Sequence, residues 1–127
     1  MSIKSILSLA VMVTAAAAGA IQARCNPNPP AIKDANTVTL ALYGDSGCCD
    51  APFQTISLGV VGTCHTINAP GLGWEQAVGQ NMFGQGIKIW TFTDTNCQSN
   101  GKFIDLHNSN TCDFRGEQFQ SIKLATA

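Results

Sequence analysis

The pattern of apolar and polar positions after residue 24 is that of an all-β protein. Short runs of β-branched, aromatic and aliphatic residues are separated by Gly, Asp, Asn and Ser, which is typical of strands joined by turns. The predicted strands are residues 37–43, 53–61, 63–67, 87–93, 102–106 and 119–124. The strongest is 87–93, where Lys88, Trp90 and Phe92 alternate with three β-branched residues. We expect helix only as a turn or two near 74–78.

Much of this pattern occurs twice. The matching stretches are 40–48 with 89–97, at an offset of 49, and 56–64 with 104–112, at an offset of 48. Each half of the repeat has two cysteines fifteen residues apart, Cys49 and Cys64 in the first and Cys97 and Cys112 in the second. A unit that recurs predicts one supersecondary motif used twice. Short strands joined by turns in two such motifs predict a small sandwich or barrel.

The repeat divides the mature chain into an arm and one β domain. The expected parts are a proline-rich arm at 24–36 and a domain at 37–127, with motifs at about 38–82 and 87–124. The glycine-rich stretch from Asn68 to Trp74 is interpreted as an insertion that lengthens the first motif. The closing strand 119–124 aligns with either 84–89 or 74–79. We favour 74–79, because the other alignment would make one strand end the first motif and begin the second.

The first residues have the order of a secretory signal peptide. Lys4 precedes an apolar run at 6–13, and small residues follow at 15–20. We expect a signal peptide at 1–20, cleaved at its end or as late as Ala23. A retained membrane anchor is disfavoured, because the apolar run is shorter than the roughly 20 residues that span a bilayer. The mature protein is therefore expected to be secreted and extracellular.

All six cysteines lie after the expected cleavage site, and an even number in a short exported chain predicts a disulfide framework. The predicted bonds are Cys49–Cys64, Cys97–Cys112 and Cys25–Cys48. The first two follow from the equal spacing, and the third would tie the arm to the first turn. The main alternative exchanges the partners of Cys48 and Cys49. Metal-bound cysteines are disfavoured because the chain has no C-x-x-C.

Charge excludes two classes of partner. Without Lys4, six basic and eight acidic residues remain, so the mature net charge is −2. The basic residues are scattered along the chain, whereas a nucleic-acid interface needs a clustered basic face. The same scatter argues against a cationic surface that inserts into anionic lipid. No later segment predicts a membrane span.

The two motifs resemble a known family. An aromatic-ended strand at 40–43 and again at 89–92 leads into an Asp turn, and a second strand and a cysteine follow. With the closing strand 119–124, this order resembles the Greek-key motif of the βγ-crystallin superfamily. The resemblance covers most of 38–124 and implies a small, disulfide-stapled β-sandwich of two Greek-key motifs. Calcium-binding members carry paired Asn or Asp before a Ser/Thr-Ser pair, which 116–121 lacks, so no metal or cofactor is implied.

Three sets of residues spell catalytic chemistry without its context. The letters Gly-Asp-Ser-Gly at 44–47 match the nucleophile loop of trypsin-like proteases, but the second motif fills this place with other residues, which favours a turn. A small secreted ribonuclease would need convergent acid, base and phosphate-binding groups, for which the candidates are His65, Glu75, His107 and Arg115. A glycosidase would need paired carboxylates, for which the candidates are Asp94, Asp105 and Asp113. Turn-forming is the commoner role of such Asp residues, and we predict no enzyme.

Aromatic residues are the remaining candidates for a contact site. Tyr43 and Trp90 occupy equivalent strands and are interpreted as core or half-core residues. Trp74 lies in the expected glycine-rich insertion, and loops on a rigid scaffold often carry function. The predicted contact residues are Asn68, Gly71, Leu72 and Trp74.

Size, signal peptide and cysteine content also resemble the small cysteine-rich proteins that filamentous fungi secrete, some of which are effectors on hosts or toxins on competitors. We therefore expect a monomeric, non-enzymatic fungal effector or elicitor, associated with virulence. Its expected partner is a host or microbial protein or a cell-wall polysaccharide. The alternatives are an antimicrobial or killer-toxin-like protein and, below it, the ribonuclease.

Overall fold

The computed structural model describes residues 30–108 and 111–127. The expected signal peptide, Cys25 and most of the arm lie outside these ranges. The strands are β1 (Val38–Tyr43), β2 (Gln54–Leu58), β3 (His65–Val78), β4 (Ile87–Phe92), β5 (Lys102–Asp105) and β6 (Asp113–Thr126). A single 3₁₀ turn, η2 (Gln80–Met82), connects β3 to β4. The all-β prediction is therefore confirmed for the described part of the chain.

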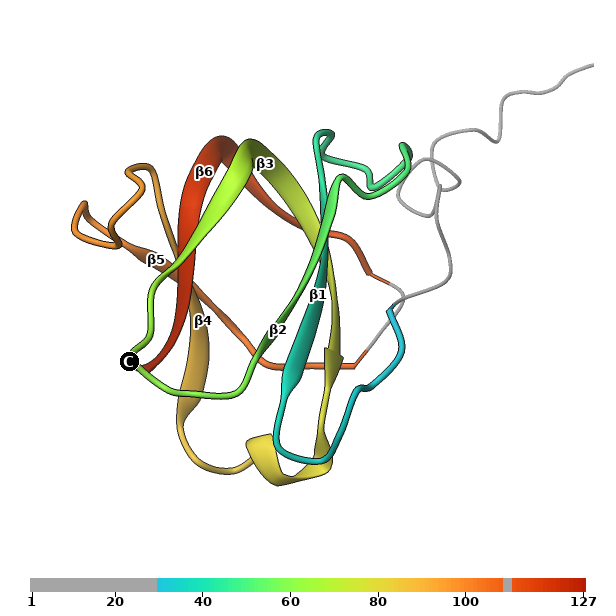
Figure 1. Ribbon diagram of the computed structural model, residues 1–127, viewed down its shortest axis with the longest axis vertical. Coiled ribbons are helices and arrows are strands. Elements are labelled where there is room, and N and C mark those ends of the chain that lie inside the picture. Colours follow the sequence, from blue (N-terminus) through green and yellow to red (C-terminus); the bar gives the residue numbers. More distant parts are fainter. Residues whose placement is uncertain (1–29, 109–110) are drawn as a thin grey trace, which may run out of the picture.

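The six strands form one antiparallel sheet in the order β2-β1-β3-β6-β4-β5 (Figure 1). The two longest strands, β3 and β6, have 14 residues each and pair with one another at the centre. The expected pair of separate sheets is thus replaced by one continuous sheet. It curves so that the inner faces of its two halves enclose one core, because buried side chains from both halves belong to a single cluster.

The helical turn expected near 74–78 is wrong. These residues lie in β3 and pair with β1, from Val38 opposite Val78 to Tyr43 opposite Gly73. The Asn68–Trp74 stretch is not an inserted loop either, since it belongs to the same strand. Tertiary pairing outweighs local propensity here.

The register shows that the sequence repeat is a duplication of structure. For any pair between β3 and β6, adding 48 to the number of the β3 residue and subtracting 48 from that of the β6 residue gives an observed pair. His65 opposite Ile122 maps onto Asp113 opposite Trp74, and Gly71 opposite Phe119 maps onto itself. The order β2-β1-β3 in the first half likewise matches β5-β4-β6 in the second.

Both central strands also bulge at equivalent places. The register shifts leave 67–70 unpaired in β3 and 115–118 unpaired in β6. The first half therefore has no extra insertion. The segment equivalent to 119–124 is 71–76. The favoured alignment with 74–79 therefore falls on the right strand but is shifted by three residues. The alignment with 84–89 is wrong.

The core lies between the two halves of the sheet. Its buried members come from both of them: Val38, Leu40, Leu42, Leu58, Ile67, Trp74, Val78, Met82, Ile89, Phe119, Ile122 and Leu124. At its centre the rings of Trp74 and Phe119 meet edge to face, with centroids 5.4 Å apart. Trp74 is one of the largest side chains that are fully buried, so this contact fastens β3 to β6.

The predicted disulfides within each motif are wrong. The bonds are Cys48–Cys112 and Cys64–Cys97, and each joins one half to the other with Cα atoms 5.9 Å apart. They are equivalent under the duplication, and Cys48 and Cys97 share a left-handed backbone, with φ of 53° and 56°. The cause is the central β3–β6 pairing, which brings the start of each long strand beside the first turn of the opposite half.

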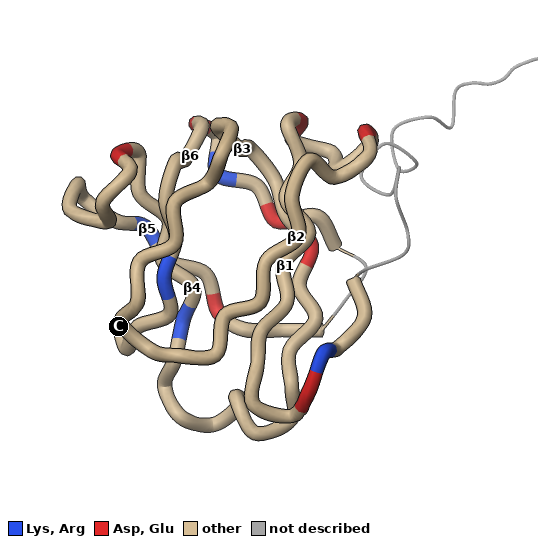
Figure 2. The backbone as a smooth tube through the Cα atoms, in the orientation of Figure 1, with Lys and Arg blue, Asp and Glu red and all other residues tan. Residues whose placement is uncertain are grey.

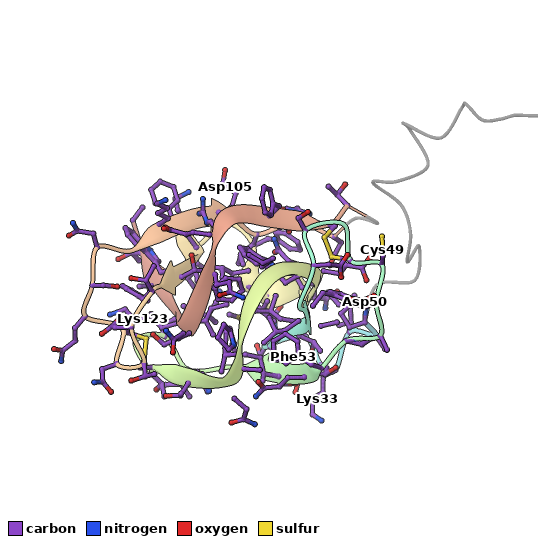
Figure 3. The ribbon with its side chains drawn as sticks, turned by 90° about the horizontal axis from the view of Figure 1, so that it is seen from above. Lys33, Cys49, Asp50, Phe53, Asp105 and Lys123 are labelled. Carbon is purple, nitrogen blue, oxygen red and sulfur yellow. A yellow bond between two sulfur atoms is a disulfide. The ribbon has the colours of Figure 1, made fainter. Side chains whose placement is uncertain are left out.

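The predicted bond Cys25–Cys48, which would tie the arm to the first turn, does not form. Cys49 is also disulfide-bonded, and its side chain is labelled in Figure 3. Cys48 is bonded to Cys112 and therefore not to Cys25. The partner predicted for Cys48, Cys25, lies outside the described residues.

Candidate functional site

The letters Gly-Asp-Ser-Gly form a turn held by Asp45. Its carboxylate accepts hydrogen bonds from the backbone N–H of Cys49 at 2.8 Å and of Asp50 at 3.3 Å. In the second half, Asp94 accepts from the N–H groups four and five residues further on, at 3.1 and 3.2 Å. The two aspartates therefore do the same structural work in equivalent turns.

The four ribonuclease candidates come from β3, from the segment after β5 and from β6. His65 begins β3 and Glu75 follows ten residues later in the same strand, beyond the bulge at 67–70. Glu75 is fully buried and accepts a hydrogen bond of 2.7 Å from the hydroxyl of Tyr43. His107 pairs with Asp113 at 3.0 Å. Desolvation lowers the pKa of Arg115, while Asp113 and Glu117 act in the opposite direction.

The three aspartates offered for a glycosidase serve separate structural contacts. Asp94 holds its turn, Asp105 pairs with Lys88, and Asp113 accepts a hydrogen bond of 2.9 Å from the amide of Gln76. The Gln76 carbonyl in turn accepts from the backbone N–H of His107 at 3.1 Å. This network fastens the segment after β5 to β3.

The predicted contact residues do not form an exposed site. Trp74 is in the core, and Gly71 is buried where the rings of Phe53 and Phe119 would touch any added side chain. Leu72 is half-buried, and Asn68 alone is exposed, with its N–H donating to Gln54 at 3.2 Å. The Asn68–Trp74 prediction is therefore wrong for its main residue, because the glycines serve close packing and not a loop.

A different surface gathers aromatic and charged side chains. It is the outer face of β4, β5 and β6, made by Lys88, Trp90, Phe103, Asp105 and Lys123, which we call the aromatic–lysine face. Neighbouring residues in these strands point into the core, so these five point outward. Basic residues follow the same three strands in Figure 2.

A cross-strand row runs over this face. Trp90 on β4 lies opposite Phe103 on β5 and opposite Lys123 on β6. The rings of Trp90 and Phe103 have centroids 5.1 Å apart and are inclined by 44°. Phe103 keeps 46% of its surface exposed. An apolar ring pair thus lies on the surface where a soluble sheet usually presents polar side chains.

Cations surround the rings. The ammonium of Lys88 lies 5.3 Å from the centre of Phe103 and also pairs with Asp105. The ammonium of Lys123 lies 5.5 Å from the centre of Phe92. Each is within the range of a cation–π interaction. Lys102 alternates with Phe103 and therefore points to the other side of β5, where it pairs with Glu117 at 2.8 Å.

A shallow hollow of about 240 Å³ opens beside the row. Its lining residues are Trp90, Phe92, Lys123, Ala125 and Thr126. Gly101 makes room for the two rings, because a side chain there would start 2.6 Å from Phe92 and 2.8 Å from Trp90. The hollow therefore has an aromatic wall and a cationic rim.

The outer face of the first half is different. Thr55 on β2 is exposed, whereas Ala41 on β1 and Glu75 on β3 are buried. The arm lies beside this face, since Pro30, Ala31 and Lys33 line one hollow together with side chains of β1 and β2. Figure 3 shows Lys33 and Asp105 projecting from opposite sides of the molecule.

The sequence contained a signal for the aromatic–lysine face. Lys88, Trp90 and Phe92 share one side of the strand and alternate with apolar residues on the other. The half-core interpretation of Trp90 agrees with its half-buried side chain, but it overlooked the lysine on the same side of the strand. Phe103 carried the same signal, since it stands between exposed Lys102 and core-facing Ile104.

Comparisons with protein-family models, with curated proteins and with solved structures found no match. Within residues 30–108 and 111–127, no helix is long and apolar enough to cross a membrane.

Proposed function

We propose that this is a secreted binding protein of the fungal effector type, which acts outside the producing cell through the aromatic–lysine face. The observation that carries the proposal is the ring pair of exposed Phe103 and half-buried Trp90, with its flanking lysines. Exposed aromatic residues on a rigid surface are common anchors for ligands and partners.

The scaffold supports an extracellular role. Two disulfides join the halves of the sheet, and such bonds persist in oxidising compartments. A chain of this size buries a thin core, and cross-links are the usual supplement to it. The signal peptide and the two-Greek-key arrangement of the βγ-crystallin resemblance remain predictions that accord with this role.

The test is saturable binding of labelled protein to isolated host and microbial cell surfaces. We compare the wild type with Phe103→Ala and with Thr55→Ala, the equivalent position in the first half. Binding that is lost with Phe103→Ala and kept with Thr55→Ala supports the proposal. Equal binding by all three proteins would exclude the aromatic–lysine face as the contact surface.

The bound surface also separates the two expected biological roles. An effector binds host material and triggers a response in host cells. An antimicrobial protein binds microbial surfaces and inhibits growth of the microbe. Clear growth inhibition without any response of host cells would replace the effector role with the antimicrobial one.

A further inference from the structure

We propose that the ligand of the aromatic–lysine face is an acidic polysaccharide, a chain of sugar rings that carry carboxylates. This inference rests on the proposed function only in taking this face as the contact surface. It names the chemistry of the ligand from the arrangement of rings and charges.

The ring row suits the flat faces of sugars. Phe103, Trp90 and Lys123 occupy three neighbouring strands, so the row extends about 10 Å across the sheet. Sugar rings present C–H faces that pack on aromatic side chains, while their hydroxyl edges remain free for hydrogen bonds. The ion pair of Lys88 and Asp105 lies beside Phe103 and offers both a donor and an acceptor to those edges.

The charges on the face indicate that the sugar ligand carries a carboxylate. Lys88 and Lys102 are each paired with an acidic residue, and within the described residues Lys123 has no such pair. Lys123 stands at the rim of the hollow that Trp90 and Phe92 line. A carboxylate on a sugar stacked over Trp90 is complementary to this cation, and a charge-assisted hydrogen bond there is stronger than a neutral one.

The same charges disfavour a nucleic acid. Binding to a phosphate backbone relies on several cations that neutralise phosphates. In the second half of the sheet, Asp105 and Glu117 already neutralise two of the three lysines. A carboxylated sugar chain can be held by its C–H faces and hydroxyls with a single ion pair to Lys123, so it fits the face better than a phosphate backbone, which relies on several cations.

The experiment is a titration of the full mature protein with polygalacturonate and with its methyl ester, which has the same sugar chain without the charge. We expect the wild type to bind polygalacturonate at least roughly tenfold more tightly than the methyl ester. Lys123→Gln removes this preference and leaves the weaker binding of the ester. Phe103→Ala weakens both roughly tenfold, because it removes the stacking surface. Raised salt weakens only the polygalacturonate complex.

Thr55→Ala and Lys33→Gln are the matched controls, since both lie on the outer side of the first half. They are expected to bind as the wild type does. All variants change exposed or half-buried side chains, and an unchanged thermal unfolding midpoint confirms that they fold. Equal affinity for acid and ester, with no effect of Lys123→Gln, would overturn the acidic ligand. Binding to neither, while Phe103→Ala still abolishes surface binding, would overturn the polysaccharide and leave the proposed function intact.

Discussion

The two halves of the sheet share a backbone and differ on their outer faces. Equivalent outward positions hold Ala41 and Trp90, Thr55 and Phe103, and Glu75 and Lys123. Equivalent inward positions remain apolar in both halves, as Leu40 and Ile89 show. The shared core constrains the inner faces, because a lost apolar contact there lowers the stability of both halves. The outer faces carry no such constraint, and one presents the aromatic–lysine face while the other lies beside the arm.

The interior ring of the first half sets the largest expected difference. Trp74→Ala removes a fully buried ring and its contact with Phe119, so we expect the free energy of unfolding to fall by about 5 kcal/mol. Trp90→Ala, on the outside of the second half, is expected to cost about 1 kcal/mol. Urea unfolding followed by circular dichroism measures both. Similar losses for the two would contradict the assignment of one ring to the core and the other to the surface.

The disulfides test how equal the halves are. Replacing Cys48 and Cys112 by Ala opens a loop of 64 residues, and replacing Cys64 and Cys97 opens one of 33. Because the dependence on loop length is logarithmic, each change is expected to cost about 4 kcal/mol, the first slightly more. Urea unfolding compares them. A cost close to zero for either pair would show that the two bonds are not equivalent, and non-reducing peptide mapping checks the pairing.

A hydrogen bond distinguishes the buried outer side of the first half. Tyr43→Phe deletes the hydroxyl that donates to the buried carboxylate of Glu75, which is expected to cost about 1–3 kcal/mol. The reverse change on the exposed side, Phe103→Tyr, is expected to stay within about 0.5 kcal/mol of the wild type. The same unfolding assay applies. A neutral Tyr43→Phe would mean that another donor replaces the hydroxyl.

The Asp turns give the smallest effect. Desolvation raises the pKa of Asp94, but hydrogen bonds from Ser99, Gln98 and Asn96 outweigh it and hold the pKa below 3.8. The unfolded state therefore binds the proton more readily, so the stabilisation is present above pH 3.8 and is lost as the pH falls through the folded pKa. Asp94→Asn is expected to lower the melting temperature at neutral pH and to make little difference in strong acid. An equal loss at both pH values would attribute the effect to the side chain's shape.

The sequence predicted the short strands well and the long ones poorly. Strands 87–93 and 102–106 agree closely with β4 and β5, because alternation over one face is a local signal. The length of β3 was missed because Gly71 and Gly73 looked like loop residues. Gly73 is needed for close approach, since an added Cβ would lie 2.9 Å from both the Asp45 carbonyl and the Cys112 sulfur. Such contacts come from distant segments and leave no local trace.

The disulfides and the site failed for a related reason. Equal spacing of cysteines is the same whether bonds form within each repeat or between repeats, and only the central pairing of β3 with β6 decides it. Trp74 was assigned from its neighbours in sequence, whereas its burial depends on which face of the folded sheet it occupies. The alternation around Lys88 was the better guide.

The crossed disulfides change what a protease can achieve. A single peptide segment, which includes the exposed residues from Phe83 to Gly86, joins β3 to β4. A cut there leaves two chains that remain tied by Cys48–Cys112 and Cys64–Cys97. The nicked protein is expected to migrate as one species on a non-reducing gel and as two after reduction. It would keep both faces in place after the one peptide connection between the halves had been cut.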